Sequence, residues 1–92
     1  MPETHPDLPP LSEIQLELVN LIWDQERMTV AELWKILQAR RGVSRNTVQT
    51  MVSRLEDKGW LTHEDEGGTF IYRVTIPRDE AQRQTVRKLV DT

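Results

Sequence analysis

The chain has 92 residues, of which 37% are hydrophobic, and its formal net charge at pH 7 is −3. This length accommodates one small domain, or one domain and part of a second. The absence of cysteine excludes a disulfide framework, a thiolate metal site and a cysteine nucleophile. No apolar run is long enough to cross a membrane, and no basic region precedes an apolar segment as in a signal peptide. We therefore expect a cytoplasmic protein.

The charges are unevenly distributed along the chain. Residues 35–55 contain no acid and hold the basic residues Lys35, Arg40, Arg41, Arg45 and Arg54. The acids lie elsewhere, most densely in the run Glu64-Asp65-Glu66. A basic segment inside an acidic chain predicts an anion-binding surface on one side of the protein.

The first helix is predicted to follow a proline-rich leader. Residues 1–10 are rich in proline, which lacks an amide proton and restricts the residue before it, so we expect a flexible segment. Ser12 and Gln15 then form a capping box, which signals a helix start. Apolar residues follow at helical spacing, with Trp23 beside them: Ile14, Leu18, Leu21 and Ile22.

A second helix is predicted by the same signal. Thr29 and Glu32 form another capping box, and apolar residues again recur at helical spacing: Val30, Leu33, Trp34 and Leu37. Gly42 is suited to end this helix, and Ser44 to cap a third one almost immediately afterwards. Two short helices joined by a tight, glycine-containing turn predict a helix-turn-helix motif.

The third helix, residues 44–58, has two different faces. One face is apolar: Val48, Met51, Val52 and Leu55. The opposite face carries small polar side chains flanked by Arg45 and Arg54: Asn46, Gln49, Thr50 and Ser53. In a DNA recognition helix such polar groups read base edges while arginines hold phosphates. A solvated surface helix has the same pattern, so this helix alone leaves both interpretations open.

A β-hairpin is predicted after the third helix. Residues 60–63 and 69–76 are rich in β-branched and aromatic side chains, and Gly67-Gly68 between them is a strong turn signal. The expected fold is therefore mainly α with a small β-hairpin, a winged helix-turn-helix over residues 11–76. Pro77 suits the first residue of a fourth helix. Because no helix stop precedes Thr92, we expect this helix to continue in the native chain.

Residues 47–61, TVQTMVSRLEDKGWL, resemble the penicillinase-repressor family of BlaI/MecI/CopY-type transcriptional regulators. Further matches are LSEIQLELVNLIW (11–23), MTVAELWKIL (28–37) and FIYRV (70–74). The resemblance implies a winged-helix DNA-binding domain followed by a helical dimerisation module, which would begin at residues 77–92 and its apolar Val86, Leu89 and Val90. It also implies a repressor that binds a palindromic operator as a homodimer.

The same resemblance implies how such repressors are induced. In the antibiotic-responsive branch a membrane sensor triggers proteolytic cleavage beyond the winged helix, which here would lie past Thr92. In the copper-responsive branch C-terminal cysteines bind metal, and this chain has none. We expect no metal or cofactor, because His5 and His63 have no partners at metal-ligand spacing and are interpreted as ordinary surface residues.

The predicted site is a DNA-binding surface. The expected base-reading residues are Asn46, Gln49, Thr50 and Ser53. The expected phosphate-binding residues are Arg45, Thr47, Arg54, Arg41, Lys35 and Arg73. The predicted hairpin tip, residues 64–68, carries acids that phosphates would repel, so deep insertion of the wing is not expected. Arg73, on the returning strand, is the better candidate for a backbone contact.

Two other classes of function compete with DNA binding as interpretations of this sequence. The negative net charge of the chain and the acids of the hairpin favour a winged helix used for protein–protein interaction. The absence of acids from residues 35–55 disfavours it. An enzyme would need a convergent nucleophile, acid–base or metal constellation, and the sequence shows no paired histidines and no phosphate-cradling glycine loop, so no enzyme is expected. The tryptophans are interpreted as core or boundary anchors: Trp23, Trp34 and Trp60.

Overall fold

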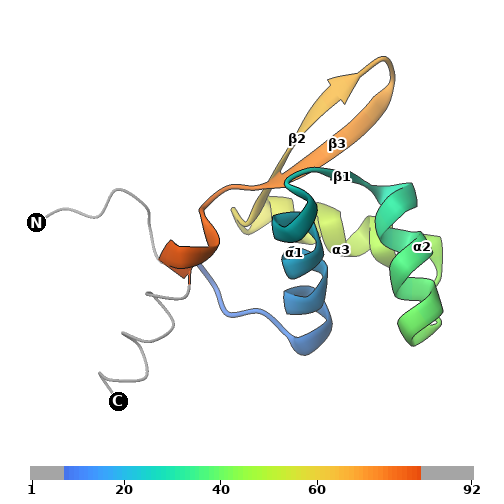
Figure 1. Ribbon diagram of the computed structural model, residues 1–92, viewed down its shortest axis with the longest axis horizontal. Coiled ribbons are helices and arrows are strands. Elements are labelled where there is room, and N and C mark those ends of the chain that lie inside the picture. Colours follow the sequence, from blue (N-terminus) through green and yellow to red (C-terminus); the bar gives the residue numbers. More distant parts are fainter. Residues whose placement is uncertain (1–7, 82–92) are drawn as a thin grey trace, which may run out of the picture.

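A computed structural model of the chain describes residues 8–81 (Figure 1). Its elements are α1 (Glu13–Gln25), β1 (Met28–Thr29), α2 (Val30–Arg41), α3 (Arg45–Asp57), β2 (Leu61–Glu66) and β3 (Thr69–Val74). The three strands form one antiparallel sheet in the order β1-β3-β2. The expected apolar stripe of Val86, Leu89 and Val90 lies outside the described residues, as does His5.

The helices begin at the predicted caps. Ser12 Oγ accepts the Gln15 amide at 3.3 Å, and Gln15 Oε1 accepts the Ser12 amide at 3.0 Å. Thr29 and Glu32 repeat this reciprocal pair at 3.2 and 2.9 Å. Each cap satisfies amides that the first helical turn leaves without partners, which stabilises a helix by about 1 kcal/mol. The predicted starts of α1 and α2 are therefore confirmed.

The turn between α2 and α3 also follows the prediction. Gly42 ends α2 with a φ of 68°, a left-handed conformation that glycine adopts without strain. Ser44 then caps α3, because its Oγ accepts the Thr47 amide at 3.1 Å. The two helices are thus joined by three residues, 42–44, as a helix-turn-helix requires.

The sheet contains a strand that sequence reasoning missed. Met28 and Thr29 pair with Tyr72 and Ile71, so β3 lies between β1 and β2. A strand of two residues is too short to show the alternation of apolar and polar side chains that marks a strand in a sequence. Thr29 is at the same time the N-cap of α2. The pairing arises only because β3 is brought alongside, which no local sequence signal reports.

The acids of the hairpin lie on a strand and not in the turn. The expected tip was residues 64–68, but β2 extends to Glu66, which pairs with Thr69. The turn is only Gly67-Gly68, with φ values of 62° and 89°. Positive φ at both central residues suits the tight turn that matches the twist of a hairpin. The acidic run therefore lines the side of the wing, and the predicted position of the tip was wrong.

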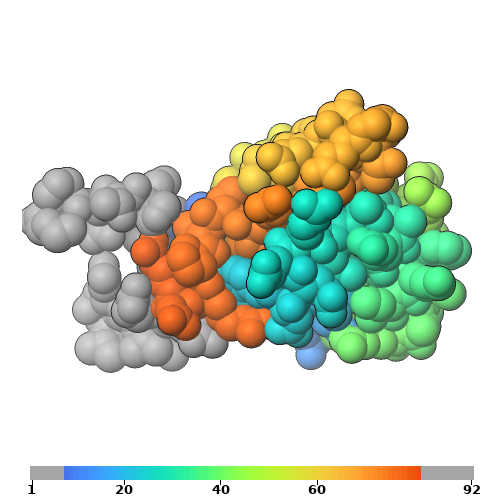
Figure 2. Space-filling model, turned by 45° about the horizontal axis from the view of Figure 1, so that its top comes forward, coloured from blue at the N-terminus to red at the C-terminus, as the bar shows by residue number. Residues whose placement is uncertain are grey.

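The core lies where the three helices meet the base of the hairpin. Its largest fully buried side chains come from all three helices: Leu18, Ile22, Leu33, Leu37, Leu55, Val19, Val48 and Val52. Trp60 and Tyr72 close it from the hairpin side. Figure 1 shows the rest of the hairpin projecting beyond the helices, and in Figure 2 it stands as a ridge along the molecule. Within residues 8–81, no helix has the length and apolar character to cross a membrane.

The tryptophans are core or boundary anchors, as predicted. The indole Nε1 of Trp23 donates to the Ile76 carbonyl at 3.0 Å, and that of Trp34 to the Val43 carbonyl at 3.2 Å. Trp60 is buried and donates to the Pro9 carbonyl at 2.8 Å. The last contact holds the end of the proline-rich leader against the core.

The segment after the hairpin turns back onto α1. Residues 78–81 are helical, and the Ala81 amide donates to the Pro77 carbonyl at 3.2 Å. Pro77 therefore precedes the first helical residue, one position earlier than predicted. Arg78 binds Asp24 at 2.7 Å and lies 5.3 Å from the centre of the Trp23 ring. These contacts fix where the chain leaves the winged-helix core.

Candidate nucleic-acid interface

The predicted recognition helix α3 packs one face inward and leaves the other open. Val48, Val52 and Leu55 are fully buried. All ten predicted site residues are exposed: Lys35, Arg41, Arg45, Asn46, Thr47, Gln49, Thr50, Ser53, Arg54 and Arg73. The inner face packs on α2 and β2 (Figure 1). A helix held this way presents its polar side as a rigid surface.

The four predicted base-reading residues do not occupy one line along α3. Asn46, Thr50 and Ser53 share a stripe, because residues four and seven positions apart lie above one another on a helix. Gln49 lies at the margin of this stripe, in line with Glu56, which follows it by two turns. The helix therefore has a central polar stripe and a margin that leads toward the wing.

The predicted phosphate ligands fall into two groups. Among residues 8–81, Arg45, Arg54 and Lys35 form no ion pair, so their charges are available to an external anion. By contrast, Arg73 lies 3.5 Å from Glu64 across the hairpin, and Arg41 is paired with Glu17. The hydroxyl of Thr47 is 3.0 Å from that of Ser44, within the cap of α3.

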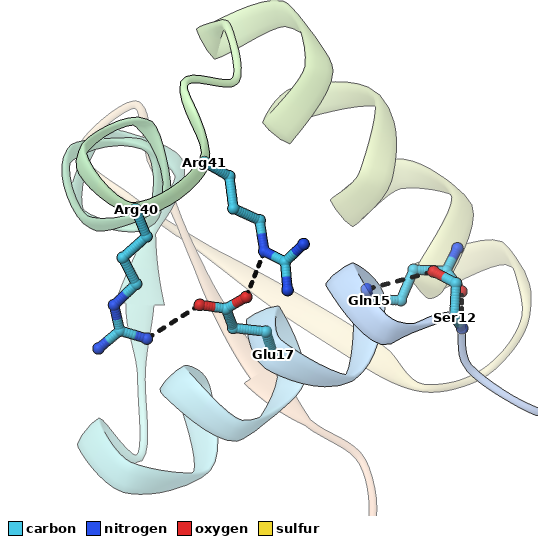
Figure 3. Close-up of polar contacts among 5 residues, drawn as sticks. All are labelled: Ser12, Gln15, Glu17, Arg40 and Arg41. Carbon is cyan, nitrogen blue, oxygen red and sulfur yellow. Dashed lines mark hydrogen bonds and ion pairs between the residues drawn. The ribbon is translucent and has the colours of Figure 1, made fainter.

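Glu17 of α1 binds two arginines from the end of α2. Its Oε2 accepts from Arg40 at 3.0 Å, and its Oε1 accepts from Arg41 (Figure 3). The hydrogen bonds from Arg41 and Arg40 lower the pKa of Glu17 below its ordinary value of 4.5. The basic segment 35–55 is therefore partly neutralised by an acid from another helix, which sequence spacing did not indicate.

This arrangement predicts an acid-sensitive contribution to stability. Because the folded-state pKa of Glu17 is lowered, its ion pairs stabilise the fold above the ordinary pKa of 4.5, and this contribution is lost as pH falls through the folded-state value. We expect the free energy of unfolding to decline more steeply below about pH 5 in the wild type than in Glu17→Gln. Urea denaturation at several pH values measures this. Equal slopes would contradict it, and an Arg40→Gln/Arg41→Gln background, in which Glu17→Gln should change nothing further, is the control.

A second cluster joins the wing to α3, and sequence reasoning missed it. His63 Nδ1 lies 2.7 and 2.9 Å from the two carboxylate oxygens of Glu56. The His63 ring stacks on Phe70, with centroids 4.3 Å apart, and lies 5.4 Å from the Tyr72 ring. His63 is thus a half-buried contact between α3 and the hairpin, and its interpretation as an ordinary surface residue was wrong.

Tyr72 is the most deeply buried member of this cluster, with 2% of its surface exposed. Burial, and after it the negative charge of Glu56, raises the pKa of the Tyr72 hydroxyl above its ordinary 10.0. Within the described part of the chain, no three His, Cys, Asp or Glu residues are grouped so that they could hold a metal ion.

The helix-turn-helix of α2 and α3, with the hairpin that follows it, defines a winged helix-turn-helix protein, and the predicted fold class is confirmed. The chain belongs to the penicillinase repressor family, whose profile matches residues 11–92. A solution structure of the DNA binding domain of the repressor BlaI has a TM-score of 0.71 and 34% identity, covering 80% of this chain and 90% of that one.

Further relatives agree with this assignment. A solution structure of the Bacillus licheniformis BlaI monomeric form in complex with the blaP half-operator has a TM-score of 0.70 and 34% identity, covering 80% of this chain and 90% of that one. The penicillinase repressor of B. licheniformis is 34% identical over 73 residues, 79% of this chain and 57% of that protein. An uncharacterised 16.5 kDa protein of Latilactobacillus sakei is 31% identical over 75 residues, 82% of this chain and 51% of that protein. The chain thus spans little more than half the length of these two relatives.

Proposed function

We propose that this protein is a sequence-specific DNA-binding transcriptional repressor that places α3, with its cap and its last turn (residues 44–58), in the major groove of an operator. The observation that carries the proposal is the exposed polar face of α3, which is flanked by arginines that have no ion-pair partner among the described residues. The likeness to BlaI in complex with a half-operator supports it.

The proposed roles follow the placement of each side chain. Base edges would be read by Asn46, Gln49, Thr50 and Ser53. Phosphates would be held by Arg45, Arg54 and Lys35, with Thr47 contributing from the cap of α3. Arg41 and Arg73 would contact phosphates only in exchange for their present acidic partners, so we assign them a weaker contribution.

Dimerisation is the second part of the proposal. BlaI binds a half-operator in its monomeric form, which supports an operator of two parts that two copies of the protein would occupy. We propose residues 11–76 as the DNA-binding unit and residues 77–92 as the start of the segment that joins two copies. Tethering two modules makes the second contact effectively intramolecular and strengthens binding. Induction by proteolysis is proposed on the family resemblance alone.

The competing proposal is a winged helix that binds another protein instead of DNA. The overall negative charge favours it, but the likeness to a DNA binding domain and to a half-operator complex does not. Selection of bound sequences from random duplex DNA distinguishes the two. A repressor should recover a palindromic motif, and its affinity should fall steeply with salt, because each neutralised phosphate releases counterions. Recovery of unenriched sequences would reject the proposal.

Arg54→Ala tests the phosphate contacts. We expect it to weaken binding to operator and random DNA alike and to lower the slope of log affinity against log salt by about one. Arg54→Lys, which keeps the charge, is the matched control and should keep the slope. Fluorescence anisotropy at several salt concentrations measures both. A loss confined to one base position would instead assign Arg54 to base readout.

A further inference from the structure

We propose that His63, on the wing strand β2, is a positioning residue that keeps the Glu56 carboxylate of α3 away from DNA phosphates. Held against the wing, this acid does not oppose binding at the margin of the recognition helix. The inference rests on the proposed DNA-binding function, and it adds to that function a residue that acts through another side chain and not by touching DNA.

Glu56 occupies a place where a free carboxylate would oppose DNA binding. It lies on the wing-side margin of α3, two turns beyond Gln49 and facing the same way. A helix with its side chains is about 10–12 Å wide and the major groove about 12 Å, so the margins of a bound helix face the phosphate backbones. A carboxylate there is repelled by phosphates. The Glu56 side chain is 33% exposed, so burial alone does not withdraw it.

His63 binds both oxygens of this carboxylate. Its Nδ1 lies 2.7 and 2.9 Å from the two Oε atoms of Glu56. An ionised carboxylate offers only acceptors, so Nδ1 carries the hydrogen and donates it. The imidazole ring is itself fixed, because it stacks on Phe70 with centroids 4.3 Å apart and its residue pairs with Tyr72 on the central strand. The ring therefore holds the carboxylate against the wing.

The three acids of the wing also have partners. Two are paired with arginines and the third accepts from a backbone amide of the turn: Glu64 with Arg73 at 3.5 Å, Glu66 with Arg27 at 3.2 Å, and Asp65 with Gly68 at 2.8 Å. Exposed contacts of this kind contribute little to stability. What they share is that each restrains a negative charge. Glu56 extends this set from the wing to the margin of the recognition helix.

His63→Phe is the variant to test, because it keeps an aromatic ring against Phe70 and removes the Nδ1 donor. We expect the affinity for operator and random DNA to fall alike, by about two- to fivefold at low salt, as for one unfavourable exposed charge. The loss should shrink as salt rises, because salt screens exposed charges. His63→Asn, whose side-chain amide retains a donor, should keep the wild-type affinity.

Adding Glu56→Gln separates this role from a merely structural one. In the His63→Phe background it should restore the wild-type affinity, because it removes the released charge without rebuilding the contact. Glu13→Gln, which removes one charge from an exposed position on α1, is the matched control and should not restore it. A double variant as weak as His63→Phe alone, or a His63→Phe variant that binds like the wild type, would overturn the inference.

A measurement without DNA separates this inference from the proposed function. In the free protein, the losses of unfolding free energy in His63→Phe and Glu56→Gln should be non-additive, because both substitutions alter the same contact. Urea denaturation of the two single variants and the double variant measures this. Additive losses would contradict the contact itself. If the losses are non-additive while the wild type selects no DNA sequence, the contact stands, but the DNA-binding proposal fails together with the role of His63 in it.

Discussion

Truncation of Leu55 to alanine is expected to lower the free energy of unfolding by about 2–5 kcal/mol. Leu55 is fully buried on the inner face of α3, where α3 meets the rest of the core. The substitution removes apolar contacts and leaves a cavity that close-packed neighbours fill only in part. A domain of this size has only about 5–10 kcal/mol of stability, so the variant should be partly unfolded at moderate temperature. Urea denaturation followed by tryptophan fluorescence measures the change.

The same substitution at an exposed leucine is the control. Leu16 on α1 is 45% exposed, so Leu16→Ala should change the free energy of unfolding by less than about 1 kcal/mol. Equal losses at the two positions would mean that α3 does not pack its apolar face into the core. The orientation of its polar face toward DNA would then lose its structural basis.

Gln49→Ala has the largest expected effect on recognition. If the amide pairs with a base edge, its removal should cost about 1–3 kcal/mol at a single base position and relax the preference there. Binding measured against duplexes that differ at one position gives this value directly. Gln38→Ala, at an exposed glutamine on α2, is the matched control and should leave the preference intact. Equal weakening on every sequence would assign Gln49 to the DNA backbone.

The helical part of the fold was predictable because its signals are local. Ser12 with Gln15, and Thr29 with Glu32, mark helix starts through bonds between residues three apart. Gly42 marks a helix end by its own conformation. The two faces of α3 follow from helical periodicity alone. These features require no knowledge of the rest of the chain.

The parts that were missed depend on contacts between distant residues. Strand β1 exists only because β3 lies beside it. Glu17 neutralises Arg41 from 24 residues away in sequence. His63 is placed by β2 against a carboxylate on α3, so its solitary position in the sequence carried no sign of a role. The predicted polar face of α3 follows from periodicity, but the contact of His63 with the Phe70 ring could not.

Mapping the DNA contact on this chain by NMR tests directly whether the exposed face of α3 binds DNA. Backbone amide resonances would be followed while a duplex obtained by selection is added. We expect the largest changes in residues 44–54, with smaller ones at Lys35 and at the margin of α3 that leads toward the wing. Changes centred on the exposed side of α1, with α3 unaffected, would show that the exposed face of α3 does not bind DNA.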